Sequence, residues 1–430
     1  MAVTGRLVLL VALGAVPVAL LPGWVPAAAW ALVVVLAVGA DLLLAASPRA
    51  LALERRVPEA LRLGEATTSE LLVTNPGRRR LRGVVRDAWP PSAGSGEDRH
   101  ALDVPAGERR RLVTSLRPTR RGDREADRVT VRALGPLGVA ARQRSRDVPA
   151  SVRVLPPFRS RRHLPSRLAR LRDLEGRSAV QVRGQGTEFD SLRDYVEGDD
   201  VRSIDWRATA RRQELVVRTW RPERDRRVLL VLDTSRTAAG RVGDAPRLDA
   251  ALDAALLLAA LASRAGDRVD LVAVDRRVRA RVERATGAAL LPALVQAMAP
   301  LEARLTEADW PLVVRTLRTS LTRRALVVLL TPLEPAAVEE GLLPVLGQLT
   351  SRHQVVVASV TDPRLAQMRA GRGDEVAVYD AAAAERTLLE TDRLVERLSR
   401  AGVHVVRGTP EELPPRLADA YLALKAAGRL

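Results

Sequence analysis

The feature that most constrains the fold is the alternation of apolar strands and helices over residues 228–430. Residues 228–232 (VLLVL) and 326–330 (LVVLL) are uninterrupted apolar runs, as expected for central strands of a parallel sheet. Between them, the Ala/Leu-rich residues 248–265 predict a helix that ends at Gly266. Such alternation predicts an α/β domain with helices on both faces of a parallel sheet, and sites in such sheets lie beyond the carboxyl ends of the strands.

Two apolar runs at the start of the chain predict a transmembrane helical hairpin over residues 1–48. Residues 7–21 carry no charge and residues 27–46 carry only Asp41, whereas a membrane-spanning helix needs about 20 apolar residues. Asp41 lies near the inner end of its run, where we expect it to snorkel toward the headgroups. Arg6 precedes the pair and arginines follow it, so both ends are expected in the cytoplasm, with the cell membrane as lipid partner. The alternative is a cleaved signal peptide followed by a single anchor.

Residues 49–158 predict a second kind of structure. Short alternating runs are separated there by Gly, Pro and Asn turns, which is typical of a small antiparallel β-sandwich. Residues 159–227 follow as a linker and a charge-dense segment. The chain is therefore predicted to be a membrane-anchored multidomain protein.

The charge balance narrows the choice of partners. The 430 residues include 69 Lys and Arg against 51 Asp and Glu, a formal net charge of +18. Nucleic-acid binding is not expected, because aromatic residues make up only 3% of the chain and do not interleave with the basic ones. An anionic membrane surface accounts for the charge more simply. The chain has no cysteine, which excludes disulfides, thiolate nucleophiles and cysteine-based metal sites.

The charge-dense segment lies just before the first apolar strand. Residues 184–211 read GQGTEFDSLRDYVEGDDVRSIDWRATAR, with acidic and basic side chains in alternation. One interpretation is structural, with bidentate Arg–carboxylate pairs that hold an irregular segment against the following domain. The other is a catalytic carboxylate pair of the glycosidase kind. The structural interpretation is favoured, because so many arginines would hold the carboxylates ionised and no His or Lys accompanies them.

This segment resembles the signature of the DUF58 family, and the order of the predicted parts resembles that family as well. Members are bacterial membrane-associated proteins, commonly encoded beside MoxR-type AAA+ ATPases and other von Willebrand A proteins. The resemblance therefore implies a non-enzymatic adaptor or scaffold with such partners and a C-terminal von Willebrand A-like (Rossmann-like) domain. The residues that carry the signature are Gly184, Gly186, Glu188, Phe189, Arg193, Tyr195, Gly198, Asp199, Asp200, Arg202, Asp205, Trp206 and Arg211.

The residues after the first apolar strand resemble the start of the metal-ion site of a von Willebrand A domain. In such a site a D-x-S-x-S segment, a threonine from a second loop and an aspartate from a third surround Mg²⁺ with oxygens. Asp233 and Ser235 match, Thr237 replaces a serine, and Thr286 is the candidate second-loop threonine. The third loop offers only Glu334, displaced from the strand end, so the predicted site is degenerate. In the alternative, Asp233 caps the next turn and the hydroxyls satisfy loop amides.

Three functions stay open at this stage. The first is the non-enzymatic adaptor, favoured because the sequence holds no complete catalytic constellation and no glycine-rich phosphate loop. The second is a metal-dependent membrane-associated hydrolase that uses Asp199, Asp200 or Asp205. The third is an envelope structural protein whose β module binds a peptide or a lipid. No catalytic residue is predicted for the adaptor.

Overall fold

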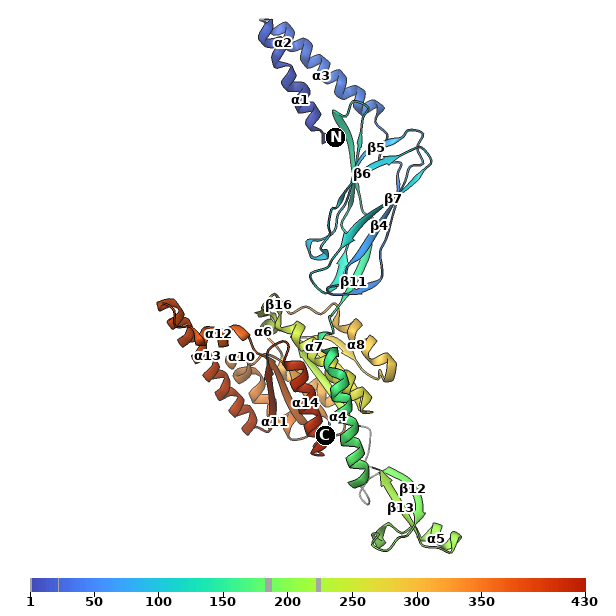
Figure 1. Cartoon of the computed structure of the whole chain (residues 1–430), viewed down its shortest axis with the longest axis vertical. Helices are drawn as coiled ribbons and strands as arrows, with labels where there is room; N and C mark the ends of the chain where they lie inside the picture. Colours follow the sequence, from blue (N-terminus) through green and yellow to red (C-terminus); the bar gives the residue numbers. More distant parts are fainter. Residues whose placement is uncertain (1, 22, 182–187, 222–225) are drawn as a thin grey trace. The chain divides into compact units, whose positions relative to one another are not determined.

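The computed structural model describes residues 2–21, 23–181, 188–221 and 226–430, and within these ranges all side chains except those of 175–191 and 219–221. The chain divides into two compact units, Met1–Pro157 and Phe158–Leu430 (Figure 1).

Unit 1 begins with three apolar helices: α1 (Gly5–Leu13), α2 (Ala15–Leu20) and α3 (Trp24–Leu44). Among the described residues, α3 alone is long and apolar enough to cross a membrane, and Gly5–Leu20 is a shorter apolar stretch. Helices α1 and α2 both contact α3. One membrane-length helix is therefore observed where two spans were predicted.

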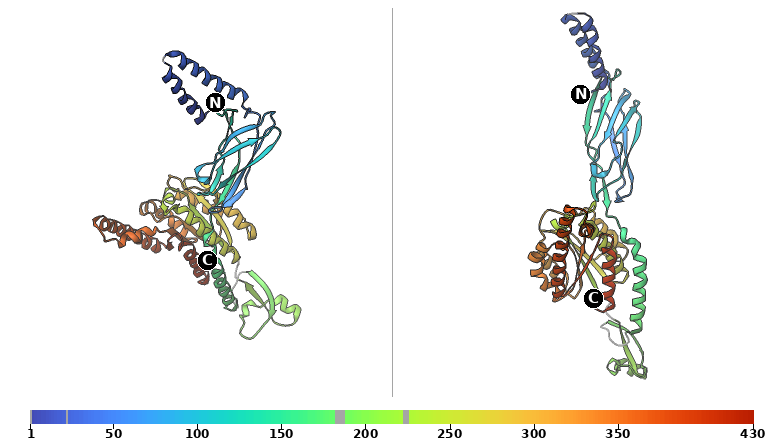
Figure 2. Two further views of the ribbon diagram at one scale, coloured as in Figure 1. Left: turned by 45° about the horizontal axis from the view of Figure 1, so that its top comes forward. Right: turned by 60° about the vertical axis from the view of Figure 1, so that its left-hand side comes forward.

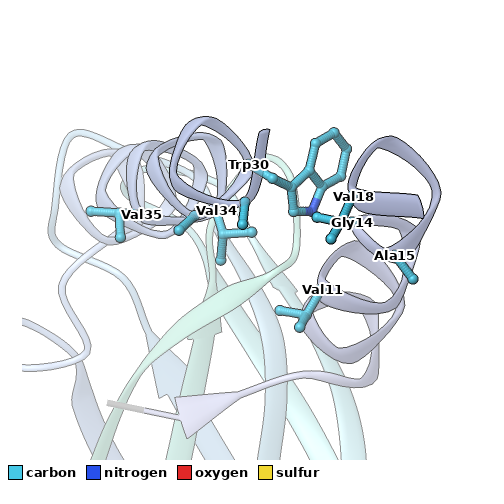
Figure 3. Close-up of a pocket in the computed structure, with 9 residues that line it drawn as sticks. Val11, Gly14, Ala15, Val18, Trp30, Val34 and Val35 are labelled. Atoms are coloured by element: carbon cyan, nitrogen blue, oxygen red, sulfur yellow. The ribbon is translucent and has the colours of Figure 1, made fainter. Parts of the chain in front are cut away.

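A tight contact at Gly14 holds this helix pair together. A Cβ atom added at Gly14 would lie 2.2 Å from Cδ1 of Trp30 on α3, so only glycine fits there. At the end of α1, the N–H of Gly14 bonds to Val11 O, three residues back, and Trp30 Nε1 donates a 3.1 Å hydrogen bond to Leu10 O. The indole thus satisfies a carbonyl that would otherwise face an apolar environment. Figure 3 shows the apolar cavity beside this contact, about 440 Å³ in volume.

The rest of unit 1 consists of three sheets. Their orders are β1-β10-β9-β5-β6, β2-β4-β7 and β3-β11-β8. Side chains from β4, β5 and β9 share one buried cluster, so the first two sheets pack face to face around a common core. The strands are β1 (Ala2–Val3), β2 (Ala52–Arg56), β3 (Ala60–Arg62), β4 (Thr67–Thr74), β5 (Leu81–Asp87), β6 (Arg99–Val104), β7 (Arg109–Leu116), β8 (Gly122–Glu125), β9 (Val129–Leu134), β10 (Ala140–Arg146) and β11 (Ser151–Leu155).

The core of this β module contains a buried ion pair. Arg55 Nη2 lies 2.6 Å from Asp87 Oδ1, and both side chains are fully buried. The second carboxylate oxygen of Asp87 accepts hydrogen bonds from the hydroxyls of Ser69 and Thr114, and the guanidinium of Arg55 lies 5.4 Å from the ring centre of Trp89. Every oxygen of the carboxylate is thus satisfied, which such a pair requires in a protein core.

The β module is joined directly to α3 through Asp41. This side chain is fully buried, and its carboxylate accepts backbone hydrogen bonds from Leu137 (2.7 Å), Val139 (2.6 Å) and Ala140 (3.0 Å). A Cβ atom added at Gly135, in the same β9–β10 turn, would lie 2.4 Å from the Asp41 carboxylate. The expectation that Asp41 snorkels is therefore wrong: its charge is held by amides of the β module.

The amino terminus meets the same turn. Strand β1 pairs with β10, and Thr4 Oγ1 donates a 2.6 Å hydrogen bond to Gly138 O. Arg79 Nη1 donates to the carbonyls of Leu43 and Leu44 at the end of α3. Both ends of the helix pair therefore contact the β module.

Unit 2 is built on a six-stranded sheet in the order β18-β17-β14-β19-β20-β21. All neighbours are parallel except β17 and β18. The order runs one way from β14 to β18 and the other way from β19 to β21, so it reverses between β14 and β19. The strands are β14 (Arg227–Asp233), β17 (Arg268–Val274), β18 (Val278–Val282), β19 (Leu326–Leu330), β20 (Gln354–Val360) and β21 (Val403–Gly408).

Helices cover both faces of this sheet, as predicted (Figure 2). Helices α7 and α14 contact each other and several strands of the sheet. Side chains of α9, α11 and α13 belong to a separate core cluster that also includes strand residues. The buried runs of β14 and β19 account for the accuracy of this prediction. The helices are α4 (Leu164–Gln181), α6 (Arg236–Ala239), α7 (Arg247–Arg264), α8 (Leu290–Met298), α9 (Trp310–Ser320), α10 (Pro335–Ala337), α11 (Leu343–Thr350), α12 (Pro363–Ala370), α13 (Glu375–Arg400) and α14 (Leu413–Ala426), and a short strand pair comprises β15 (Arg241–Val242) and β16 (Ala245–Pro246).

The signature segment forms a small hairpin of its own. Strands β12 (Glu188–Asp194) and β13 (Val216–Arg221) pair antiparallel, with a bulge between Phe189 and Ser191. A 3₁₀ turn (Val201–Ser203) and helix α5 (Trp206–Arg212) lie between the two strands.

Candidate functional site

The candidate site lies where the strand order of the sheet reverses. Asp233 is the last residue of β14, and Thr331 directly follows β19. The two strands are parallel neighbours in register, with Leu232 opposite Leu330, so Asp233 and Thr331 meet at one carboxyl edge. This crevice is the usual ligand position in an open α/β sheet.

Asp233 organises the edge through three hydrogen bonds. Its Oδ1 accepts from the backbone N–H of Ser235 (2.8 Å), and its Oδ2 accepts from the hydroxyls of Thr237 (3.0 Å) and Thr331 (2.7 Å). The hydroxyls of Ser235 and Thr237 are 3.1 Å apart, and all four residues are buried. The structure thus brings Asp233, Ser235 and Thr237 together as predicted, and it adds Thr331.

A second loop closes over these residues. The backbone N–H of Arg304 donates to Thr234 O, and that of Arg236 donates to Thr306 O, each at 2.8 Å. The hydroxyls of Thr234 and Thr306 are buried and have no hydrogen-bond partner within the described ranges. The loop before α9 therefore contributes Thr306 to this edge, a residue that the metal-site sequence pattern did not indicate. A clue to Thr306 was available in the sequence. Its loop comes before the predicted helix over residues 310–321 and does not directly follow a strand.

Thr286 is not part of this edge. Strand β18 runs antiparallel to β17, with Val278 opposite Val274 and Val282 opposite Leu271. A chain that leaves β18 therefore moves toward the amino end of β17, and the N–H of Arg284 donates to Asp270 there. The predicted role of Thr286 is wrong because the hairpin reverses the direction of the chain.

Glu334 is engaged in an ion pair rather than with Asp233. Its Oε1 lies 3.1 Å from Nη1 of Arg247, the first residue of α7. Arg247, Asp233 and Thr331 line one small cavity of about 10 Å³, room for roughly one water molecule. A second ion pair, between Arg236 and Glu307, lies on the same loops.

These donors do not suit a resident Mg²⁺ ion. The ion needs about six oxygens, several of them charged. Two buried carboxylates lie at this edge: Asp233 after β14 and Asp275 after the neighbouring β17. Both oxygens of Asp233 already accept hydrogen bonds, and Asp275 accepts from Arg277 N and Arg279 Nε. Over the described ranges, no three His, Asp or Glu side chains come together in a group that could hold a metal. Asp233 accepts the backbone N–H of Ser235, as the capping alternative expects, but the hydroxyls of Thr237 and Thr331 bond to its carboxylate rather than to loop amides.

The acidic residues of the signature have structural partners. Asp199 pairs with Arg193 at 2.5 Å and accepts the backbone N–H of Val196. Asp200 caps the following 3₁₀ turn by accepting the N–H of Arg202. These contacts fit the structural interpretation of the segment.

Asp205 has a similar role one turn later. It caps α5 by accepting the N–H groups of Arg207 and Ala208, and its other oxygen lies 2.8 Å from Arg218 Nε. The N–H of Ala208 first, and Arg218 second, hold the pKa of Asp205 below its usual value. A carboxylate held ionised in this way is a poor general acid.

The other signature residues are distributed as follows. Trp206 is 66% exposed, and Arg202 and Arg211 are exposed as well. Tyr195 is half-buried, and Gly198 has a positive φ of 103°, which favours glycine. Glu188 and Phe189 begin β12. Gly184 and Gly186 lie outside the described residues.

Comparisons with known proteins give few functional clues. The chain is 28% identical over 194 residues to the uncharacterized proteins Rv1480 of Mycobacterium tuberculosis and Mb1516 of Mycobacterium bovis, over 44% of this chain and 60% of each relative. The chain thus spans about three fifths of the length of these relatives.

The solved structures that resemble parts of this chain do so only weakly. The CARDB domain of PF1109 from Pyrococcus furiosus is 16% identical, covers 24% of this chain and 86% of that chain, and has a TM-score of 0.18. A β-glucosidase from Listeria innocua is 16% identical over 23% of this chain and 16% of that chain, with a TM-score of 0.15.

The family comparison is more direct. The matching model is described as "Protein of unknown function DUF58". It begins inside the signature hairpin and ends in β21, the last strand of the sheet, and includes the whole Asp233 edge. Residues 191–404 of this chain therefore match the DUF58 family.

Proposed function

We propose that the chain is a membrane-anchored DUF58 protein that acts as a non-enzymatic adaptor. In this proposal the helix pair spans the cell membrane twice, and both soluble parts face the cytoplasm. The α/β unit serves as a von Willebrand A-like binding domain. Its partner is a MoxR-type AAA+ ATPase, with which it acts in the assembly or activation of other proteins.

The observation that carries this proposal is that Asp233 and the aspartates of the signature segment are already bonded to partners within the chain. Asp233 uses both oxygens to organise its own loops, and Asp199 and Asp205 are each paired with an arginine. The groups that a hydrolase would need free are therefore engaged in structure. The edge presents ion pairs such as Arg236–Glu307, which suit recognition of another protein.

The membrane part of the proposal rests on the helix pair. Helix α3 has the length and apolar character of a span, and β1 and the end of α3 both contact the β9–β10 turn. This arrangement supports a chain that enters and leaves the bilayer on the same side, with the shorter α1–α2 stretch as the second crossing. The flanking arginines favour the cytoplasmic side.

Affinity purification tests the adaptor function. The wild-type chain, extracted in detergent, is expected to recover an AAA+ ATPase identified by mass spectrometry. Arg236→Glu changes the edge and should reduce that recovery several-fold, whereas Arg315→Glu, the same charge change on α9, should not. Failure of the wild type to recover any AAA+ ATPase would refute the proposed partner.

Membrane orientation is tested separately. Since the chain has no cysteine, a single Val113→Cys change on β7 gives one thiol for labelling. A membrane-impermeant maleimide should label it only after the cells are lysed. Labelling in intact cells would place the β module outside and contradict the cytoplasmic orientation.

A further inference from the structure

Arg247 occupies an unusual position at the Asp233 edge. It begins α7, its side chain is 23% exposed, and its guanidinium packs over Gly240, where an added Cβ would lie 3.4 Å from Cζ. Its backbone N–H donates to Gly240 O, which fixes the start of the helix. The guanidinium is thus held in place by the backbone beside the cavity that it shares with Asp233 and Thr331.

The donor capacity of this guanidinium is only partly used. Nη1 lies 3.1 Å from Glu334 Oε1, whereas Nε is buried and has no hydrogen-bond partner in the described part of the chain. A guanidinium is permanently charged and has two parallel N–H groups that match a carboxylate. One-point contact with Glu334 therefore leaves the bidentate geometry unfilled.

Glu334 is held loosely by comparison. It is 47% exposed, lies in the loop between β19 and α10, and makes no capping hydrogen bond to that helix. Ion pairs of this kind contribute little, because water competes for both partners. A second carboxylate of better geometry can therefore replace it.

A second arginine, Arg236, lies beside the same edge, and each of the two arginines is paired with a glutamate. Arg236 follows Ser235 in the same loop, and Glu307 first, with Glu334 as a minor contributor, raises its pKa. Glu334 therefore lies within the electrostatic field of two arginines. Arg236 is already paired with Glu307, so once Glu334 is displaced it is the guanidinium of Arg247 that attracts an incoming carboxylate.

We propose that the guanidinium of Arg247 binds a carboxylate of a partner protein without a metal ion. In the free protein Glu334 occupies this site, and an Asp or Glu side chain of the partner displaces it. The inference rests on the proposed adaptor function, since it assigns the chemistry of the partner-binding edge. A guanidinium supplies here the positive charge that a metal ion supplies in sites built from similar loops. When Glu334 is displaced, its ion pair with Arg247 no longer holds the loop after β19. Partner binding would therefore change the conformation of that loop.

A peptide with one carboxylate tests this site on the full chain in detergent. The probe is the pentapeptide Gly-Ser-Glu-Gly-Ser with blocked ends, its twin has glutamine at the centre, and binding is followed by saturation-transfer NMR. The wild type is expected to bind the glutamate peptide and not its twin, equally well in EDTA and in Mg²⁺. Binding that requires Mg²⁺ would overturn the proposal.

Two variants and two matched controls complete the experiment. Glu334→Gln removes the internal competitor and should tighten binding about two- to fivefold, the range expected from an exposed ion pair. Arg247→Gln should lose at least about tenfold in affinity. Glu396→Gln on α13 and Arg315→Gln on α9 make the same charge changes elsewhere and should leave affinity unchanged.

The outcomes separate this inference from the adaptor proposal. If Glu334→Gln binds no better than Glu396→Gln, Glu334 is not a competitor and the inference fails, even when the AAA+ ATPase is recovered. If the peptide binds as expected while no ATPase is recovered, the site stands and the named partner is wrong. Because Glu334 is exposed, its variant is expected to fold, so a loss of folding in Arg247→Gln does not block the test.

Discussion

Replacement of Asp41 should loosen the joint between α3 and the β module. The carboxylate accepts three backbone hydrogen bonds at 2.6–3.0 Å from a turn 96 to 99 residues away, and it is fully buried. Hydrogen bonds to a charged group contribute about 1.5–3 kcal/mol each, and the loss of one partner leaves the others unsatisfied. Asp41→Ala should therefore destabilise unit 1 by about 3–5 kcal/mol, less than the simple sum because water enters the gap.

Asp41→Asn is a graded version of the same change. The amide keeps one acceptor oxygen but places an NH₂ group against backbone donors, so we expect about half the effect. Asp103→Ala is the matched control, since that aspartate is exposed and paired with Arg80 on the same module. Its loss should cost less than about 1 kcal/mol.

The assay measures the joint directly. The absence of cysteine allows two spin labels, at Val33 on α3 and Val113 on β7, both partly exposed, in lipid nanodiscs. Pulsed electron paramagnetic resonance measures the distance between the two labels. The distribution of this distance should be narrow for the wild type and Asp103→Ala, and broad for Asp41→Ala. A distribution for Asp41→Ala as narrow as that of the wild type, with an unchanged unfolding midpoint, would refute the reasoning.

Three further predictions concern buried charges and pH, each measured by chemical denaturation of the full chain in detergent. Asp87→Asn breaks a buried ion pair and should destabilise the β module by about 3–5 kcal/mol, against less than about 1 kcal/mol for the exposed Asp123→Asn; equal effects would contradict this. Burial first, and the neighbouring Arg352 second, lower the pKa of His353. The stability that neutral His353 contributes is therefore present above pH 6.5 and is lost as the pH falls. His353→Gln should reduce the fall in unfolding free energy between pH 7.5 and 5. Burial raises the pKa of Asp253 although Ser160 donates hydrogen bonds to it. Its contribution to stability therefore declines as the pH rises through that pKa, and Asp253→Asn should be as stable as the wild type at pH 8, or more stable. A marked loss of stability in this variant would count against burial as the dominant cause.

Sequence patterns predicted the sheet well because its signal is local. The apolar runs of β14 and β19 specify buried parallel strands by themselves, and Asp233 is at the edge simply because it ends the first of them. Thr286 was misplaced because β18 runs antiparallel to β17, so the chain leaves β18 at the opposite edge of the sheet from Asp233.

The roles of Asp41 and Arg247 were beyond the reach of such patterns. Asp41 has backbone partners in a turn of the β module, and amide donors have no residue signature. Arg247 reads as an ordinary first-turn residue of a helix until the fold places it beside Asp233. In both cases the information lies in contacts between distant parts of the chain.

If α3 spans the membrane as proposed, the direct joint at Asp41 makes the β module sensitive to the thickness of the bilayer. A membrane helix accommodates a thinner or thicker hydrocarbon core partly by tilting. Because the turn that Asp41 holds moves with α3, a change in tilt is carried into the module rather than absorbed by a flexible hinge. An eight-residue strand such as β4 is about 26 Å long, so a tilt of about 10° displaces its far end by about 4–5 Å. Lipid composition would thereby set where the module presents its surfaces.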